Sequence, residues 1–413
     1  MKDNQAKYPQ LRFKGFTDPW EERKLSSISE RVTRKNKNNE STLPLTISAQ
    51  DGLVDQNDFF NKQVASRDVT GYFLVKNGEF AYNKSYSNGY PWGAIKRLDK
   101  YDMGVLSTLY IVFRPTKINS QFLVSYYDTT RWYREVSKNA AEGARNHGLL
   151  NIAPTDFFNT LLVVPKIVDE QQKIGSFFKQ LDDTIALHQR KLAKLKELKQ
   201  GYLQKLFPKN GSKFPQLRFA GFADAWEQRK LGEIAIRVRG NDGRMNLPTL
   251  TISAGNGWMD QRDRFSQNIA GKEQKNYTLL RQGELSYNHG NSKLAQFGAV
   301  FELESYNEAL VPRVYHSFSV TAGAQPKFIE QMFATHRPDR ELRKLVSSGA
   351  RMDGLLNINY DDFMGIKVWL PSVAEQQAIA GLLVKLDNTI ALHQRKLEKL
   401  QELKKGYLQK MFC

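Results

Sequence analysis

The chain has 413 residues, of which 40% are hydrophobic and 11% aromatic, a composition that favours two or three folded domains and excludes a disordered tail. Its 61 basic and 43 acidic residues give a formal charge of +18. This charge favours nucleic acid as the partner, with an anionic membrane surface as the second choice. The alternative is that the excess of basic residues only keeps the protein soluble. The single cysteine excludes a disulfide framework and a thiolate metal cluster. No apolar run approaches membrane-spanning length and the polar N-terminus is unlike a signal peptide, so we expect a cytoplasmic protein without a membrane partner.

Residues 1–165 have the pattern of a mixed α+β domain with short strands. A β-rich run at Leu45–Ala49 precedes Asp51-Gly52, a dipeptide typical of a hairpin turn. Asn77-Gly78 marks a second turn before another β-rich run. Further predicted elements are buried strands at Tyr110–Pro115 and Thr160–Pro165 and a helix at Gln121–Val136.

Residues 166–208 are predicted to form one long helix. Apolar side chains recur there at alternating steps of three and four, which is the spacing of a helix that packs against another helix. Asp169 with Gln172 is a candidate capping box at its start, and a helix from there to Phe207 spans roughly 55–60 Å. The predicted seam consists of Ile174, Phe178, Leu181, Ile185, His188, Leu192, Leu195, Tyr202 and Leu206.

The second half of the chain repeats the first. The segment Leu181–Phe207 returns as Leu386–Phe412 with 22 of 27 positions identical, and Pro9–Leu25 returns as Pro215–Leu231 with 13 of 17 identical. The offset between the copies stays at 205 or 206 along the chain, so the duplication covers both halves. In the second half we predict a domain at 209–371, which contains a helix at Phe328–Val346. A long helix follows at 372–413 and begins with a capping box formed by Ser372 and Glu375.

Two similar halves in one chain tend to pack about a pseudo-two-fold axis, and such an axis makes the two long helices antiparallel. We therefore predict an α+β protein in which two similar α/β domains are separated by two helices that form an antiparallel coiled coil. A pair of long helices of this kind would hold the two domains a fixed distance apart. DNA suits this arrangement because its half-sites recur on one face about every 34–36 Å. Since the domains have diverged, the expected site is bipartite and asymmetric. The alternative is a structural adaptor that bridges proteins through its coiled coil and is basic only incidentally.

Residues for catalysis are not recognisable in the sequence. It contains neither a P-loop nor a dinucleotide fingerprint, and no Pro-Pro dipeptide, so the Asn/Asp-Pro-Pro-aromatic loop of amino-methyltransferases is missing. The six histidines lack metal-ligand spacing. We therefore predict a chain that catalyses no reaction and holds neither a metal nor a cofactor.

Three stretches in each half carry the side chains that read base edges or hold phosphates. The first is Arg31–Lys37 and Arg237–Arg244, the second is Asn83–Asn88 and Asn288–Lys293, and the third is Arg145–His147 and Arg351–Asp353. The second stretch is short and amide-rich and differs between the copies directly after a shared Tyr-Asn, which is the pattern of a specificity loop on a common frame; an ordinary solvated loop is the alternative. The candidate DNA-binding residues of the first half are Arg31, Arg34, Lys35, Lys37, Asn83, Lys84, Ser85, Tyr86, Asn88, Arg145 and Asn146. Those of the second half are Arg237, Arg239, Asn241, Arg244, Asn288, His289, Asn291, Lys293 and Arg351.

The chain resembles, over essentially its whole length, the specificity subunit of type I restriction-modification systems. A proline followed by Glu-Gln-Gln and then Leu-Asp-x-Thr-Ile carries the resemblance, together with the domain segments LTISAQDG, YNKSYSNG and GLLNI. The matching residues are Pro165, Glu170, Gln171, Gln172, Ile174, Leu181, Asp182, Thr184 and Ile185, and Pro371, Glu375, Gln376, Gln377, Ile379, Leu386, Asp387, Thr389 and Ile390.

The resemblance implies a non-catalytic subunit that recognises double-stranded DNA for its partners. In that family the subunit binds two modification subunits, which carry S-adenosylmethionine and methylate adenine in each half of a bipartite site. A restriction subunit that uses ATP and Mg joins for cleavage. The long helices and the repeated PQLRF and WExRKL segments are the expected docking surfaces for the modification subunits.

Overall fold

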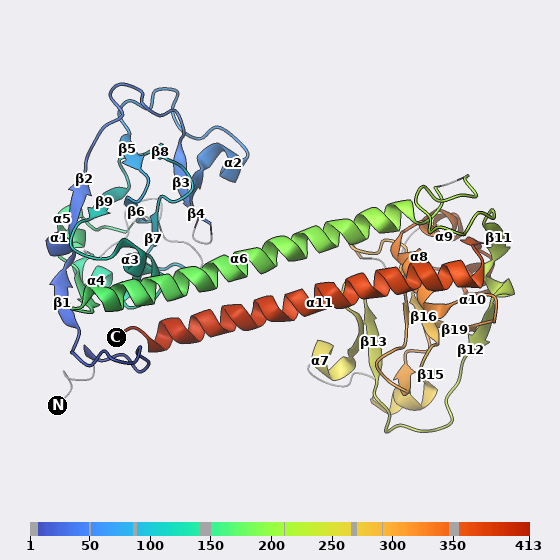
Figure 1. Ribbon diagram of the computed structural model, residues 1–413. Coiled ribbons are helices and arrows are strands. Elements are labelled where there is room, and N and C mark those ends of the chain that lie inside the picture. The colour runs from blue at the N-terminus through green and yellow to red at the C-terminus, as the bar shows by residue number, and fades with distance from the viewer. Residues whose placement is uncertain are drawn as a thin grey trace. The chain divides into compact units, whose positions relative to one another are not determined.

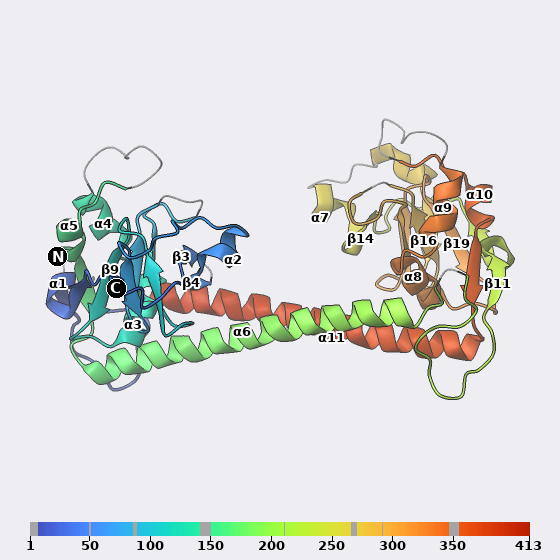
Figure 2. The same ribbon diagram turned by 90° about the horizontal axis from the view of Figure 1, so that it is seen from above.

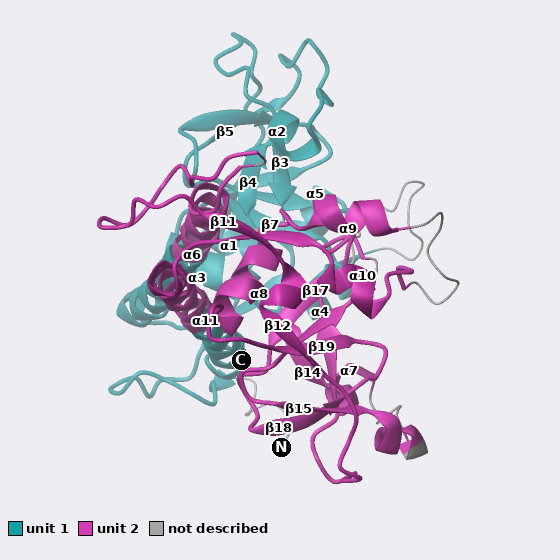
Figure 3. Cartoon of the chain, turned by 90° about the vertical axis from the view of Figure 1, so that its right-hand side faces the viewer, with its two compact units in different colours: residues 1–189, 395–413 teal, residues 190–394 magenta. Residues whose placement is uncertain are grey.

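The structure is a computed structural model that describes residues 7–48, 51–85, 89–140, 150–209, 211–265, 271–290, 292–346 and 355–413. The chain divides into two compact units (Figure 3). Unit 1 consists of residues 1–189 and 395–413, and unit 2 consists of residues 190–394. Each unit therefore contains one mixed domain, the beginning of the long helix that follows it and the end of the other long helix.

Unit 1 is built on an antiparallel four-stranded sheet in the order β2-β9-β6-β7, with three two-stranded pairs, β1-β10, β3-β4 and β5-β8, beside it (Figure 1). Its strands are β1 Glu21–Lys24, β2 Ser29–Val32, β3 Leu45–Ser48, β4 Gly52–Asp55, β5 Phe73–Lys76, β6 Phe80–Asn83, β7 Ala94–Arg97, β8 Met103–Leu106, β9 Ile111–Pro115 and β10 Leu161–Val164. Its short helices are α1 Leu25–Ile28, α2 Gln56–Phe60, α3 Ser120–Tyr127, α4 Tyr133–Asn139 and α5 Pro154–Phe158.

Unit 2 repeats this topology, with a sheet in the order β12-β19-β16-β17 and the pairs β11-β20, β13-β14 and β15-β18. Its strands are β11 Glu227–Lys230, β12 Ala235–Val238, β13 Leu250–Ser253, β14 Gly257–Asp260, β15 Thr278–Arg281, β16 Leu285–Asn288, β17 Ala299–Glu302, β18 Glu308–Val311, β19 His316–Val320 and β20 Lys367–Leu370. Its helices are the 3-10 turns Leu231–Glu233 and Gly271–Asn276 and α7 Gln261–Phe265, α8 Pro326–Ala334, α9 Asp339–Leu345 and α10 Tyr360–Met364. The predicted α+β class with an internal repeat is confirmed.

One class of predicted element is wrong in both halves: the single helices at Gln121–Val136 and Phe328–Val346 are each two helices, α3 with α4 and α8 with α9. An equivalent threonine interrupts both. The Thr129 hydroxyl donates to the Tyr126 carbonyl at 2.6 Å, and the Thr335 hydroxyl donates to the Met332 carbonyl at 2.6 Å. Such a side chain competes with the backbone bonds that would continue the helix.

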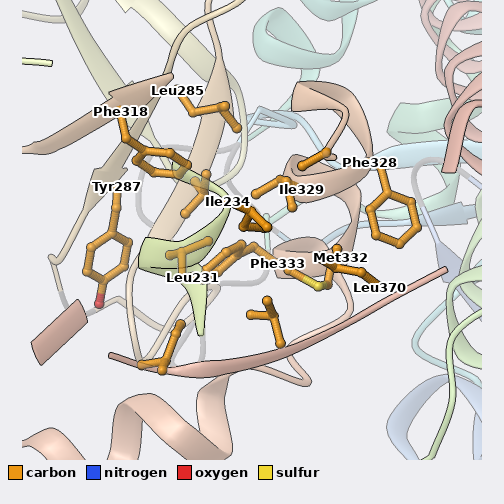
Figure 4. Packing of buried hydrophobic residues seen from close by; sticks show 14 of the residues in the cluster. Leu231, Ile234, Leu285, Tyr287, Phe318, Phe328, Ile329, Met332, Phe333 and Leu370 are labelled. Carbon is orange, nitrogen blue, oxygen red and sulfur yellow. The ribbon is translucent and has the colours of Figure 1, made fainter. Parts of the chain in front are cut away.

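The core of each domain lies between the four-stranded sheet and its short helices. In unit 2 the side chains of Leu285, Tyr287 and Phe318 from the sheet pack near Phe328 and Met332 of α8 (Figure 4). Trp20 and Trp226 are 1% and 2% exposed. Burial of these large apolar side chains supplies most of the driving force for each domain, at roughly 25 cal/mol per Å².

The two long helices, α6 Val168–Lys205 and α11 Val373–Lys410, have 38 residues each and lie side by side (Figures 1 and 2). In unit 1 the Lys404 ammonium, near the end of α11, lies 2.7 Å from an Asp182 carboxylate oxygen in α6. In unit 2 the matching Lys199 of α6 lies 2.6 Å from Asp387 of α11. In both units the end of one helix therefore meets the beginning of the other, and the predicted antiparallel pairing is confirmed.

The repeated Glu-Gln-Gln anchors each long helix to its own domain. Glu170 accepts two hydrogen bonds from the Arg12 guanidinium, at 2.6 and 2.8 Å, and Arg218 makes the same pair of bonds to Glu375 at 2.8 and 2.7 Å. The next residue, Gln171, accepts from the Asn119 backbone amide before α3 and donates to the Pro165 carbonyl. These contacts fix the angle at which α6 leaves the domain, which explains why both copies carry the same residues.

Candidate nucleic-acid interface

The first predicted stretch of unit 1 is partly occupied by internal contacts. Arg34 donates to both carboxylate oxygens of the buried Glu79, at 3.0 and 2.8 Å, and Lys35 donates to the Gly71 carbonyl at 2.8 Å while lying over the Phe73 ring. Arg31, on β2, and Lys37 are exposed. Phosphate contacts require accessible cations, and Arg31 and Lys37 are the members of this stretch whose side chains are exposed.

In the matching stretch of unit 2, one arginine is likewise paired with carboxylates while others are exposed. Arg244 pairs with Asp242 at 2.6 Å and with Glu308 at 2.7 Å, and Asn241 donates to the Arg244 carbonyl at 3.0 Å. Arg239 is exposed. Arg237 is also exposed, and its guanidinium lies over the Tyr360 ring at 4.1 Å from the centroid, which orients the charge without neutralising it.

The second stretch of unit 1 begins with a local turn at the end of β6. The Asn83 side-chain oxygen accepts from the Ser85 backbone amide at 3.0 Å, and the Lys84 ammonium donates to the Ile152 carbonyl at 3.4 Å. The Lys84 carbonyl in turn accepts from the Leu150 amide at 2.9 Å. Tyr86, Asn88, Arg145 and Asn146 lie outside the described residues.

In unit 2 the second stretch begins with the same turn, but a different side chain follows it. Asn288 accepts from the Gly290 amide at 3.1 Å, as Asn83 does from Ser85. His289, which occupies the position of Lys84, is buried with 4% of its surface exposed, and its ring nitrogens lie 2.7 and 2.9 Å from the Leu356 and Val314 carbonyl oxygens. Lys293 is exposed, whereas Asn291 and Arg351 lie outside the described residues.

The structure brings the second stretch together with the segment that follows the third. The backbone amide of Leu150 donates to the Lys84 carbonyl, and that of Leu356 donates to the His289 carbonyl at 2.8 Å. Gly290 and Leu355 form an antiparallel bridge. In each domain two segments more than 60 residues apart are therefore pinned at one point beside the four-stranded sheet, which is a rigid frame for loops.

Two residues that sequence reasoning missed complete this region in unit 2. His316 of β19 stacks on His289 with ring centroids 5.0 Å apart, and Tyr360 of α10 contacts the His316 ring edge-on at 5.7 Å. A signal for His316 existed in the repeat itself: the matching residue in the first copy is the buried Ile111. A polar ring in place of a core aliphatic side chain indicates a new partner nearby.

Burial lowers the pKa of His316 to about 4, because the ring loses its solvation and accommodates a proton poorly. The unfolded chain binds that proton at about pH 6.5, so unit 2 should lose stability as the pH falls from about 6.5 to about 4, by about 1.4 kcal/mol per pH unit at most. Urea unfolding of unit 2, followed at several pH values, measures this loss. A His316→Ile variant, which restores the residue of the first copy, should unfold with a flatter pH dependence; an unchanged slope would assign the effect to other groups.

The described residues offer no group of three or more His, Cys, Asp or Glu side chains arranged to hold a metal ion. Among the helices of the described ranges, none combines the length and apolar character required to cross a membrane.

Comparison with known proteins gives one family match, which covers part of the chain. Residues 17–197 match the model of the type I restriction modification DNA specificity domain, whereas no curated protein matches the chain. A solved structure described as the type I restriction-modification system S subunit from M. genitalium has 14% sequence identity, a TM-score of 0.59, and coverage of 98% of this chain and 99% of that chain. This likeness shows that the fold extends over both halves.

Two further solved structures resemble the chain at lower TM-scores. The HsdS subunit from Thermoanaerobacter tengcongensis has 17% identity, a TM-score of 0.42 and coverage of 97% of this chain and 98% of that chain. A chain from a structure on complex assembly and conformational transition of the type I R-M system has 16% identity, a TM-score of 0.45 and coverage of 96% and 98%. The family resemblance stated from the sequence is confirmed for residues 17–197, which match the type I restriction modification DNA specificity domain.

Proposed function

From the membership of residues 17–197 in the type I restriction-modification DNA specificity domain family, we propose that the whole chain is the DNA-recognition subunit of a type I restriction-modification complex. The observation that carries the proposal is the repeat: unit 2 has the same strand order as the domain that matches the family. The domains, taken as residues 1–165 and 209–371, each bind one half of an asymmetric bipartite site in double-stranded DNA. The chain itself catalyses no reaction and scaffolds two modification subunits and the restriction subunit.

Support for asymmetric recognition comes from the residues at the start of the second stretch in each domain. The two domains share the sheet, the Asn83 and Asn288 turns and the tethers to Leu150 and Leu356, yet Lys84 and His289 differ at the same position. A common frame with divergent side chains at its edge reads different bases at equivalent places. One long helix follows each domain in the sequence, and we propose that the length of these helices sets the spacer between the half-sites.

Exchange of residues 83–88 for an unrelated loop of the same length should change the recognised bases in one half-site only, because the loop is rooted on one domain. The measurement is a map of methylated adenines in a host that supplies the modification subunits, with and without the variant. Exchange of residues 288–293 is the matched control and should alter the other half-site. Uniform loss of binding to both half-sites would demote the loops to phosphate contacts.

Support for two identical docking sites comes from a duplicated apolar patch. In unit 2, Leu198, Tyr202 and Leu217 border a pocket of about 500 Å³ together with Gly201. Leu198 and Leu217 are 46% and 40% exposed. Exposed apolar side chains that gather beside a pocket mark an interaction surface. The apolar patch of unit 1 has the matching residues Leu403, Tyr407, Leu11 and Gly406, of which both leucines are also exposed.

The glycines of the patch strengthen this interpretation. Gly201 and Gly406 lie inside helices, where glycine costs about 1 kcal/mol relative to alanine. A Cβ atom at either position would meet nothing within 4 Å, so the described part of the chain gives no reason for the missing side chain. Close approach of a partner is the remaining reason, and two equal sites suit two copies of one modification subunit.

Replacement of Gly201 by arginine should stabilise α6 slightly, by about 0.5–1 kcal/mol, while it blocks one docking site. The expected stoichiometry falls from two modification subunits to one, and the double variant with Gly406→Arg should bind none. Native mass spectrometry measures the stoichiometry and thermal unfolding checks the fold. Two bound copies on the double variant would place the contact elsewhere on the chain.

A further inference from the structure

A tight turn between β16 and β17 presents one apolar side chain to solvent. The Ser292 amide donates to the Ala295 carbonyl at 3.1 Å, and the Ala295 amide donates to the Ser292 carbonyl at 3.2 Å and to its hydroxyl at 3.1 Å. Ala295 is 5% exposed, so it anchors the turn in the domain. Lys293 and Leu294 lie at the tip. Leu294 is 69% exposed, more than any other large hydrophobic side chain in the described ranges.

A single exposed leucine is common on protein surfaces, but this one has a matched place in the neighbouring hairpin. A Cβ atom on Gly255, in the turn between β13 and β14, would lie 3.2 Å from Leu294 Cδ1. In the first copy Gln50 matches Gly255 and Gly89 matches Leu294, so the glycine and the larger side chain have changed places. Gln50 lies outside the described residues. Gly89 has a φ of +82°, a conformation that leucine adopts only with strain.

The turn belongs to the same surface as the start of the second stretch. The Ile252 carbonyl of β13 accepts from the Asn288 side-chain amide at 3.3 Å and from the Arg264 guanidinium of α7 at 2.8 Å. The hairpin that Leu294 contacts is therefore tied both to the end of β16 and to α7. Lys293 is exposed beside Leu294, so the tip combines a cation with an apolar side chain on one fixed support.

The chemistry of base edges limits what such a leucine can read. The edges carry hydrogen-bond donors and acceptors, and the 5-methyl group of thymine is the apolar group that the major groove displays. A leucine forms no hydrogen bond and gains free energy when it covers another apolar group. A lysine is suited to a phosphate, which fixes the orientation of the protein on the duplex without reading the sequence.

We propose that Leu294 determines specificity in the second half-site by contact with the 5-methyl group of a thymine, while Lys293 holds a nearby phosphate. The inference rests on the proposed function, because it names a base-reading residue of the second domain. The first domain has no such contact at the matching position, where Gly89 carries no side chain. The two domains therefore differ here in the kind of group that they can read.

The test uses the full chain in complex with the modification subunits and a duplex whose half-sites come from the map of methylated adenines. Each thymine of the second half-site is replaced in turn by uracil, which pairs identically but lacks the methyl group. At one position the affinity should fall about fourfold, the effect of one methyl group left uncovered. The Leu294→Ala complex should bind the original duplex about tenfold more weakly and lose nothing further with uracil at that position.

Two controls identify the side chain that is responsible. Lys293→Ala should weaken binding equally on the thymine and uracil duplexes and reduce the slope of log affinity against log salt by about 1, as expected for a phosphate contact. Uracil in the first half-site should have the same effect on the wild-type and Leu294→Ala complexes. Thermal unfolding of Leu294→Ala checks the fold, which should be unchanged because the side chain is mostly exposed.

Three results would overturn the contact with thymine. They are an affinity of Leu294→Ala equal to that of the wild type, an equal loss on uracil in both proteins at every thymine, and a Leu294→Ala complex that lacks a modification subunit in native mass spectrometry. The last result would assign the leucine to a protein interface. Failure of the wild-type complex to prefer the second half-site over scrambled DNA would refute the proposed function itself, independently of Leu294.

Discussion

Replacement of Glu170 by alanine is expected to destabilise unit 1 by about 3–5 kcal/mol, the range for a buried ion pair that loses one partner. Glu170 is fully buried, and the Arg12 side chain is 13% exposed, so the guanidinium would remain with little solvent and without its paired carboxylate. The Trp20 indole N–H, 3.4 Å from a Glu170 oxygen, would lose its acceptor as well. The hydrogen bond to Glu170 is the main reason that the pKa of Arg12 is raised. Arginine stays protonated at neutral pH even without this bond, so the variant keeps the charge of Arg12.

The effect should be confined to one unit, which provides an internal control. Hydrogen exchange resolved by peptide should show faster opening of unit 1 while unit 2, with its intact Arg218–Glu375 pair, opens as before. Glu30→Ala removes an ion pair with Arg114 in which both side chains are more than half exposed, so it should cost no more than about 1 kcal/mol. An equally small loss for Glu170→Ala would mean that water or another residue compensates the arginine.

A half-length chain of residues 1–209 should form a symmetric homodimer and recognise a palindrome made of two first half-sites. In unit 1 the end of α11 completes the core: the Phe412 ring lies 5.6 Å from Phe122 and 5.8 Å from Phe178. In unit 2 the end of α6 does the same, with Phe207 stacked 5.4 Å from Phe328. The two helix ends are nearly identical in sequence, so α6 of a second copy can occupy the place of α11.

Sedimentation and DNA binding with the modification subunits measure this result. The half chain alone leaves the large apolar surface around Trp20 uncovered, so a stable, soluble monomer would contradict the proposed role of the helix ends. Phe207→Ala in the half chain is the matched control, because truncation of a buried phenylalanine costs about 3–5 kcal/mol and should dissociate the dimer. The same substitution in the full chain should destabilise unit 2 and leave unit 1 unchanged.

The candidate interface was predictable in part. Arg31, Lys37, Arg237, Arg239 and Lys293 are exposed cations, as a DNA contact requires, although their contact with DNA stays a prediction. Other members of the same stretches are paired with carboxylates, with Glu79 in one case and with Glu308 in another. Composition identifies a side chain that is able to bind phosphate, but a carboxylate that lies close only after folding decides whether that side chain is available.

Local sequence patterns also predict only part of the hydrogen bonding at the helix ends. Ser372 was predicted to form a capping box with Glu375, and its hydroxyl does accept from the Glu375 amide at 3.4 Å. The Glu375 carboxylate, however, binds Arg218 and not the backbone at the start of α11. A charged partner 157 residues away forms a stronger, bidentate contact than a neutral amide three residues away.

The sequence by itself determined the duplication, the two long helices, the short strands and the antiparallel sense of the helix pair, because spacing of apolar residues and internal symmetry are properties of neighbouring or repeated residues. Only the tertiary structure decided the register, fixed by Lys404 against Asp182 and by Lys199 against Asp387, and the burial of His289 between two carbonyls. These contacts join residues far apart in the chain. Their energies depend on distances that exist only once both segments have folded.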